Sequence, residues 1–267
     1  AIDTFLKEQG VIGLYGLDTR RLTRVLRENG TMNGCIVAEE KEIPGAIERA
    51  KAYHVEGLVR EATCPRNYVE GSDDAKYRVT ILDLGMTDCF KRYLIERGAQ
   101  VHVVNAYTKA EEILAQHPDG ILLSNGPGSS EAEPEIVAEV KKLAESGVPI
   151  MGIDLGHLML ASAMGGGLIK LKHGHRGANQ PVRYLPTDRV YISSQNHGYA
   201  VSMDALPQGA EVTFVNLNDG SCEGLLYKKL PALSVQFRPG NDEGMVDTGF
   251  LFDQFMKMME VDANAAE

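Results

Sequence analysis

From residue 77 onward, strand patterns alternate with helical patterns, and this alternation constrains the fold more than any other feature of the sequence. Short apolar runs are separated by amphipathic runs that end in glycine. In chain order the stretches are "YRVTILDLG", "CFKRYLIERG", "AQVHVVNA", "GILLSNGPG", "EIVAEVKKLAESG" and "VPIMGIDLG". Strands connected through helices form a mostly parallel sheet with helices on both faces. We therefore predict an α/β domain over residues 76–260.

The two ends of the chain follow other patterns. Late in the α/β domain, four strand-like stretches with short turns precede a closing helix: "RVYISSQNHG", "AEVTFVNL", "CEGLLY", "PALSVQF" and "TGFLFDQFMKMM". Residues 1–70 have the content of a small, partial α+β domain, with a helix in "LDTRRLTRVLRENG" and strands in "GVIGLYG" and "GCIVAE". Three elements are few for an independent core, so we expect an exposed sheet edge. The stretch "CPRNYVEGSDDAK" marks the domain boundary.

Composition narrows the classes of function. The net charge of −10 argues against a surface that binds nucleic acid, since such surfaces cluster Lys and Arg. No apolar run approaches the roughly 18 residues of a membrane-spanning helix, and the first residues lack the features of a secretory signal. The four cysteines are far apart, and His173 and His175 have no nearby third ligand. We therefore expect a cytoplasmic protein without a membrane segment, metal or cofactor.

The stretch "PIMGIDLGHLMLASAMGG" predicts a buried strand, a sharp Gly-x-Asp-x-Gly turn and a helix. In an enzyme the residue at the centre of such a turn is often a nucleophile, with backbone N–H groups nearby that stabilise an oxyanion. Here that residue is Asp154. A carboxylate that attacks an amide would form a mixed anhydride, which is much less favourable than the thioester that a cysteine forms. The alternative is a structural turn with a polar residue at its tip.

Two other segments belong to the same edge of a parallel sheet, where ligands bind. The loop "SNGPG" lacks the lysine of a phosphate-binding loop, so its glycines suit close approach to a small ligand or a plain turn. The stretch "QNHGYA" could bring Asn196 to the same crevice, and we expect His197 to be a hydrogen-bonded structural histidine.

Several motifs together resemble the small, glutamine-hydrolysing subunit of carbamoyl-phosphate synthetase. They are "LDTRRLTRVLRENGTMNGCI", "LSNGPG", "GIDLGHLMLASAMGG", "HRGANQPV", "SQNHGYAV", "NLNDGSCEG" and "SVQFRPG". The resemblance implies a class I glutamine amidotransferase-like, flavodoxin-like domain, preceded by the later part of the small subunit's own N-terminal domain. The beginning of that domain is expected to be absent from this chain. The resemblance also implies roles in pyrimidine or arginine biosynthesis and a partner that is the large subunit.

The resemblance fails at the catalytic positions. The family's turn reads G-I-C-L-G-H-Q, with the cysteine as nucleophile and the glutamine as a substrate contact, whereas this sequence has Asp154 and Leu158 there. The family's histidine base and orienting glutamate are replaced by Arg238 and Gly240 in "QFRPG". Arginine stays protonated and cannot accept a proton. We therefore predict a degenerate triad without glutaminase activity, and a salt bridge between Asp154 and Arg238.

The resemblance also implies that much of the substrate frame is retained. Gly126 and Gly128 match the glycines of the glutamine site, and the backbone N–H of Leu155 matches the oxyanion donor. The other binding loop is matched at Asn196, Gly198 and Tyr199.

Three hypotheses remain. The first is a glutaminase-inactive small subunit that serves as a structural or regulatory partner of a large subunit. The second is a module that binds glutamine or another small amino acid without a synthetase partner. The third is an active amidotransferase with rewired chemistry, in which Asp154 activates water.

Overall fold

The computed structural model describes residues 1–240 and 247–265, with side chains described as far as residue 260. Two compact units divide the chain, Ala1–Tyr53 and His54–Glu267. The boundary lies earlier than the composition change at residues 64–76. The reason is that the strand at Tyr68–Glu70 pairs with a strand of the larger unit and so belongs to its sheet.

The smaller unit contains helices without a sheet. Its elements are α1 (Ile2–Glu8), α2 (Thr19–Asn29), the 3-10 helix η1 (Glu40–Glu42) and α3 (Ile43–Ala52). The predicted helix forms because Asp18 caps it, with Oδ1 2.9 Å from the backbone N of Arg21. The strands predicted in "GVIGLYG" and "GCIVAE" are wrong, since neither stretch pairs with another in this unit.

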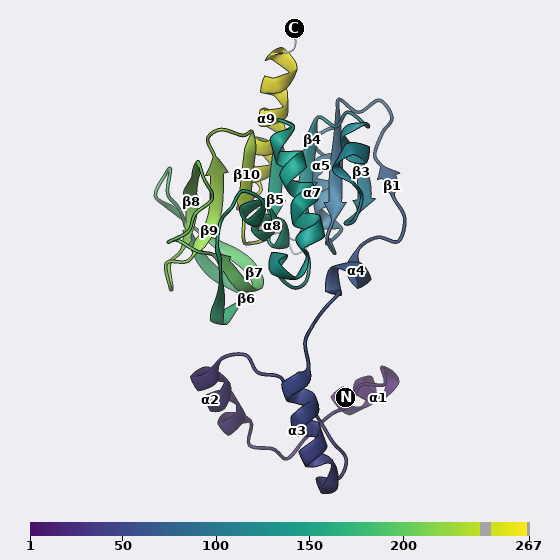
Figure 1. The fold of residues 1–267 in the computed structure, drawn as a ribbon, viewed down its shortest axis with the longest axis vertical. Helices are drawn as coiled ribbons and strands as arrows, with labels where there is room; N and C mark the ends of the chain where they lie inside the picture. The colour runs from purple at the N-terminus through teal and green to yellow at the C-terminus, as the bar shows by residue number, and fades with distance from the viewer. Residues whose placement is uncertain (241–246, 266–267) are drawn as a thin grey trace. The chain divides into compact units, whose positions relative to one another are not determined.

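The larger unit is an α/β structure with one mixed sheet (Figure 1). Its helices are α4 (Leu58–Ala62), α5 (Cys89–Ile95), α6 (Ala110–Leu114), η2 (Ser130–Ala132), α7 (Pro134–Glu145), α8 (Leu155–Ala163) and α9 (Phe250–Ala265). Its strands are β1 (Tyr68–Glu70), β2 (Tyr77–Asp83), β3 (Ala99–Asn105), β4 (Gly120–Leu123), β5 (Ile150–Ile153), β6 (Leu168–Tyr184), β7 (Arg189–Val201), β8 (Ala210–Asn216), β9 (Cys222–Tyr227) and β10 (Ala232–Val235).

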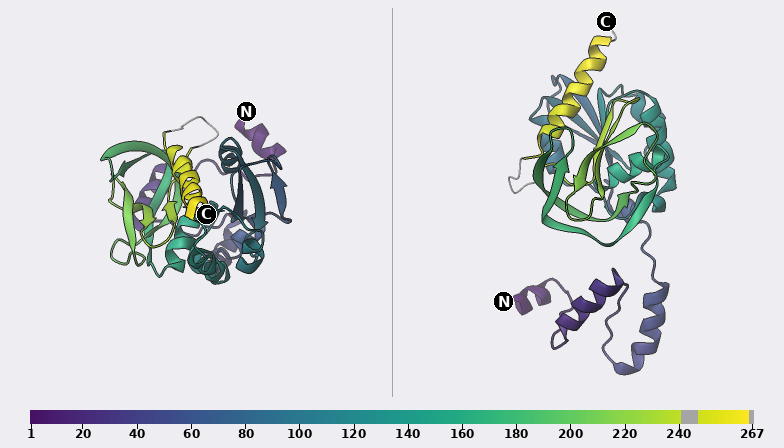
Figure 2. Two further views of the ribbon diagram at one scale, coloured as in Figure 1. Left: turned by 90° about the horizontal axis from the view of Figure 1, so that it is seen from above. Right: turned by 90° about the vertical axis from the view of Figure 1, so that its left-hand side faces the viewer.

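The sheet order places the candidate site at the centre. It runs β1-β3-β2-β4-β5-β10-β9-β8-β6-β7. The strands from β3 to β10 in this order are parallel, and the flanking strands are antiparallel. The strands of this unit are hydrogen-bonded into one sheet from β1 to β7, and α9, yellow in Figure 2, packs against it. This arrangement confirms the predicted α/β fold, in which parallel strands form the centre of the sheet and antiparallel strands extend it on both sides.

Two apolar cores cover the two faces of the sheet. One contains side chains of α6, α7 and α8, and the other contains side chains of α5 and α9. Fully buried strand residues such as Ile81 and Leu82 point to opposite faces, as alternation along a strand requires. In the described part of the chain, no helix is both long and apolar enough to cross a membrane.

Candidate active site

The turn between β5 and α8 holds Asp154 in a backbone conformation that is rare outside glycine. Its φ is 54° and its ψ is −108°, which indicates local strain. Its backbone N–H donates to the Val235 carbonyl at 2.8 Å. A Cβ on Gly156 would lie 2.2 Å from the Leu123 carbonyl oxygen, so only glycine allows α8 to approach β4 this closely. The packing of these elements therefore imposes the sharp turn that the sequence predicts.

The Asp154 carboxyl is almost completely buried at the tip of this turn, with 7% of the residue exposed. The side-chain amide of Gln236 donates to Oδ1 at 3.3 Å. Burial raises the pKa of Asp154 to about 7, because a low-dielectric environment penalises the charged form. The charge of Arg238, the Gln236 hydrogen bond and backbone hydrogen bonds from Gly126 and Leu155 act in the opposite direction. At neutral pH the carboxyl is therefore present in both its charged and its neutral form.

The predicted salt bridge between Asp154 and Arg238 is wrong. Both residues lie in the described part of the chain, and no direct ion pair joins them, although the Arg238 charge still acts on the carboxyl. The carboxyl is turned toward Gln236 and the turn's own backbone. Arg238 is half-buried and anchored by its backbone N–H, which donates to the Ser194 carbonyl on β7 at 3.0 Å. Each partner is thus held by other contacts, and the two charges interact only at a distance.

Gly240 lies where no larger residue fits without a shift of its neighbours. Its φ is 78°, and a Cβ there would lie 2.6 Å from Oη and 2.7 Å from Cζ of Tyr93. The Tyr93 ring in turn stacks on Phe252, with ring centroids 5.1 Å apart. The sequence gives no signal for this contact, because Tyr93 comes from α5, far from Gly240 along the chain. A side chain at position 240 would have to displace a buried aromatic ring.

The loops after β4, β5 and β10 meet at this turn, as expected for the carboxyl ends of neighbouring parallel strands. A Cβ on Gly126 would lie 2.2 Å from the Leu84 carbonyl oxygen and 2.9 Å from Leu155 Cδ2, so this loop also depends on glycine. Gly128 adopts a φ of 88°. Leu158 is 2% exposed and belongs to the core beneath α8. Leu158 therefore contributes packing where an amide would contribute hydrogen bonds.

Asn196, Gly198 and Tyr199 lie within β7 rather than in a loop. Asn196 pairs with Arg176 on β6 and is exposed, while Gly198 and Tyr199 are half-buried. Among the residues near Asp154, Gln236 is one that the sequence motifs do not single out as a site residue. Its position directly after β10 is the signal that could have identified it.

A buried polar network holds β7 to its neighbours, and sequence analysis missed most of it. His175 Nδ1 lies 3.0 Å from Oε1 of Glu223, and Nε2 lies 2.9 Å from Asp219. Glu223 is completely buried and also accepts from the Gln195 amide at 3.1 Å. His197 bonds the Tyr199 carbonyl at 2.8 Å and Gln195 Oε1 at 3.1 Å, as expected for a structural histidine.

The same network contains the group of residues best placed to bind a metal in the described part of the chain. His175, His197 and Glu223 offer ligand atoms within 4.8 Å of one another. Every ring nitrogen of the two histidines already has a hydrogen-bond partner. His175, His197 and Glu223 are thus better described as parts of a structural network, in which buried polar groups form hydrogen bonds with one another.

This network is expected to make stability fall at alkaline pH. Burial lowers the pKa of His175, but Glu223 and Asp219 outweigh it and raise the pKa from 6.5 to about 9. The resulting stability is complete below pH 6.5 and is lost as pH rises through about 9. We expect His175→Gln to lower the free energy of unfolding by about 2 kcal/mol at pH 6.5 and by less at pH 9.5, measured by urea titration. His173→Gln, in an exposed neighbour, is the control, and an equal cost at both pH values would contradict the assignment.

Comparison with known proteins shows which families the chain resembles. Residues 80–258 match the model for glutamine amidotransferase class-I, and residues 1–36 match that for the carbamoyl-phosphate synthase small chain, CPSase domain. The carbamoyl phosphate synthase small chain of Clostridium perfringens is 43% identical over 256 residues, which are 96% of this chain and 72% of the relative. That of Methanocaldococcus jannaschii is 42% identical over 267 residues, which are 97% of this chain and 75% of the relative.

Solved structures support the fold alone. A putative GMP synthase protein from Thermoplasma acidophilum superposes with a TM-score of 0.62 at 21% identity, over 71% of this chain and 97% of that chain. A glutamine amidotransferase from Thermotoga maritima gives a TM-score of 0.54 at 16% identity, over 69% of this chain and 98% of that chain.

Proposed function

Since the chain belongs to the carbamoyl-phosphate synthase small-chain family and contains a class I glutamine amidotransferase domain, we propose that it is a glutaminase-inactive small chain with a structural or regulatory role. The observation that carries the proposal is the buried Asp154 carboxyl at the turn where the family has its nucleophilic cysteine. A carboxylate is a poor nucleophile toward an amide, and Arg238 has no proton-accepting form at physiological pH to assist it.

The geometry around Asp154 supports the same conclusion. The backbone N–H groups of Gly126 and Leu155 act to lower the pKa of its carboxyl and so favour the charged form. Leu155 matches the family's oxyanion donor, and its backbone N–H acts on the Asp154 carboxyl, whose negative charge would oppose a developing oxyanion there. Tyr93 fills the space beside Gly240, where the family has its orienting glutamate. The residues at the positions of the nucleophile, the base and the orienting group thus all differ from those of the family.

Ammonia release from glutamine tests the proposal directly. We expect the purified chain to release ammonia no faster than the uncatalysed background between pH 6 and 9, because loss of a triad nucleophile alone costs several powers of ten in rate. Asp154→Asn is the matched control and should likewise release ammonia no faster than the uncatalysed background. Activity that rises as pH passes 7 and disappears in Asp154→Asn would contradict the proposal, since it would show Asp154 acting as a general base toward water.

Two binding measurements separate the structural role from a ligand-binding module. If the chain is a small-chain partner, it should form a complex with a carbamoyl-phosphate synthase large subunit from the same source, measured by co-purification. Calorimetry with glutamine tests the second hypothesis. We expect weak or no binding, because Leu158 is buried in the core and offers no amide to the substrate. Tight glutamine binding without a large-subunit complex would favour the binding module.

A further inference from the structure

A pocket lies between helix α9 and the antiparallel strands of the larger unit. It is lined by residues of β8, β9, β10 and α9 and by the end of β6, and its volume is about 260 Å³. Helix α8, which begins directly after Asp154, covers the opposite face of the sheet. None of the residues matched to the family's catalytic or substrate positions lines the pocket. Clefts that bind small molecules have volumes of roughly 300 to 1,000 Å³, so this pocket suits a ligand of few atoms.

The walls of the pocket are mostly apolar. Leu225 and Leu233 come from the strands, and Leu251 and Met258 come from α9. The three leucines are between 1% and 5% exposed, so they form the floor of the pocket. Phe214 adds an aromatic ring from β8. Walls of this kind favour an apolar ligand, because binding removes its surface from water.

The hydroxyl groups that line the pocket are available mainly as hydrogen-bond donors. The Tyr184 hydroxyl accepts from the Gln254 side-chain amide at 3.3 Å, which leaves its own O–H to donate. The Thr213 hydroxyl has no hydrogen-bond partner among the residues that the structure describes. The Ser234 hydroxyl is already bonded to His157 Nδ1 at 2.8 Å. A ligand that matches the free hydroxyls must therefore offer acceptors.

Lys257 adds a positive charge to the pocket. It is exposed on α9 and forms no ion pair with any residue in the described part of the chain. Glu260, one helical turn further on, instead accepts from Lys76 Nζ at 3.2 Å and from the Tyr77 hydroxyl at 2.8 Å. An ammonium group near two hydroxyl donors suits a carboxylate, because hydrogen bonds to a charged acceptor are the stronger ones.

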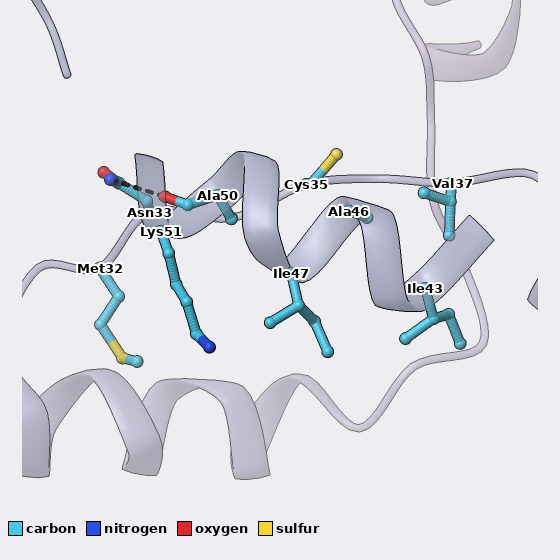
Figure 3. Close-up of a pocket in the computed structure, with 10 residues that line it drawn as sticks. Met32, Asn33, Cys35, Val37, Ile43, Ala46, Ile47, Ala50 and Lys51 are labelled. Atoms are coloured by element: carbon cyan, nitrogen blue, oxygen red, sulfur yellow. Dashed lines mark hydrogen bonds between the residues drawn. The ribbon is translucent and has the colours of Figure 1, made fainter. Parts of the chain in front are cut away.

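The apolar groove on α3 of the smaller unit does not offer this combination (Figure 3). It is larger, with a volume of about 500 Å³, and in Figure 3 Lys51 points to the same side of α3 as Ile47. Lys51 is already paired with Glu48, however, with Nζ 3.1 Å from Oε1. Of these two hollows, the α9 pocket is therefore the one that joins apolar walls to an uncompensated positive charge.

We propose that the pocket between α9 and strands β8, β9 and β10 binds a small carboxylate with an apolar body. The carboxylate pairs with Lys257 and accepts hydrogen bonds from the hydroxyls of Tyr184 and Thr213. The apolar body lies on Leu233 and Leu251. This binding uses no residue of the turn at Asp154, so its test can succeed or fail independently of the glutaminase assay.

Calorimetric titration of the full chain with hexanoate and with 3-phenylpropionate tests this proposal. A straight-chain and an aromatic acid are used because the pocket has both aliphatic and aromatic walls. We expect at least one acid to bind with a Kd below about 1 mM, and its neutral amide to bind at least about tenfold more weakly, because the amide carries no charge for Lys257. In protein labelled with carbon-13 at the methionine methyls, the Met258 signal should shift with the acid. The signal of Met164, which packs against the core on the opposite face, should not.

Three variants assign the polar contacts. Lys257→Met removes the ammonium group but keeps an apolar stem, and should weaken binding of the acid at least about tenfold. Tyr184→Phe keeps the ring and should weaken it about threefold. Lys51→Met, in the groove on α3, is the matched control and should leave the Kd unchanged. The proposal is overturned if both acids have a Kd above about 1 mM, if the amide binds as tightly as the acid, or if Lys257→Met binds the acid as tightly as the wild-type protein.

Discussion

Restoring the family's four residues with Asp154→Cys, Leu158→Gln, Arg238→His and Gly240→Glu is expected to recover little glutaminase activity until Tyr93→Leu is added. The Cβ of a residue at position 240 would lie 2.6 to 2.8 Å from three atoms of the Tyr93 ring. A glutamate there would compete with the ring for the same space, so we expect it to orient a histidine at position 238 only once the ring is removed. Orienting groups of this kind contribute factors of roughly 10³ to 10⁴ in rate. The variant with five substitutions should therefore release ammonia at least about 100 times faster than the variant with four.

Two controls make this comparison specific to the tyrosine ring. Tyr93→Phe in place of Tyr93→Leu removes the hydroxyl but keeps Cζ and Cε2, which lie 2.7 and 2.8 Å from where a Cβ at position 240 would be, so it should not restore activity. The single substitution Tyr93→Leu in the otherwise unaltered chain should give no ammonia release from glutamine. Equal activity in the variants with four and five substitutions would show that the Tyr93 ring does not prevent a glutamate at position 240 from acting. If neither variant releases ammonia from glutamine, residues other than these five must also differ from those of an active glutaminase site.

Asp154→Asn is expected to stabilise the fold, and by more at pH 8 than at pH 4. The pKa of Asp154 is raised by burial from 3.8 to about 7. Well below pH 3.8 the carboxyl is neutral in both the folded and the unfolded state. As pH rises from 3.8 to about 7 the unfolded state loses its proton first, so folding becomes less favourable, and above pH 7 the full cost is present. The gain from a neutral amide should approach about 4 kcal/mol at pH 8.

Urea unfolding of both proteins at pH 4, 6 and 8 measures this difference. Asp188→Asn is the matched control, because Asp188 has the same φ of 54° but its side chain is 81% exposed. It should change the free energy of unfolding by no more than about 0.5 kcal/mol at any of these pH values. A gain from Asp154→Asn that is equal at pH 4 and pH 8 would mean that the carboxyl is not destabilised by burial.

The sequence predicted the larger unit well because its signals are local. Apolar runs such as β2 and amphipathic runs such as α7 can be recognised from a few neighbouring residues, and the glycines on either side of Asp154 predict the turn. The family motifs identified the chain's relatives for the same reason, and the comparisons confirm that resemblance.

The errors all involve contacts between distant parts of the chain. "GVIGLYG" has the composition of a strand, but a strand also needs a partner, which composition does not supply. The expected ion pair of Asp154 with Arg238 was wrong because Gln236 and the turn's own backbone hold the carboxyl instead. The contact of Tyr93 with Gly240 joins two elements that no local pattern connects.

The strained turn at Asp154 has a consequence for protein engineering. Its geometry is set by Gly156, whose missing side chain lets α8 lie against β4, and by the hydrogen bond to Val235. Neither depends on the side chain at position 154. The backbone would therefore present any residue placed there in the same direction. The turn therefore offers a backbone position of fixed geometry at which a different nucleophile can be installed.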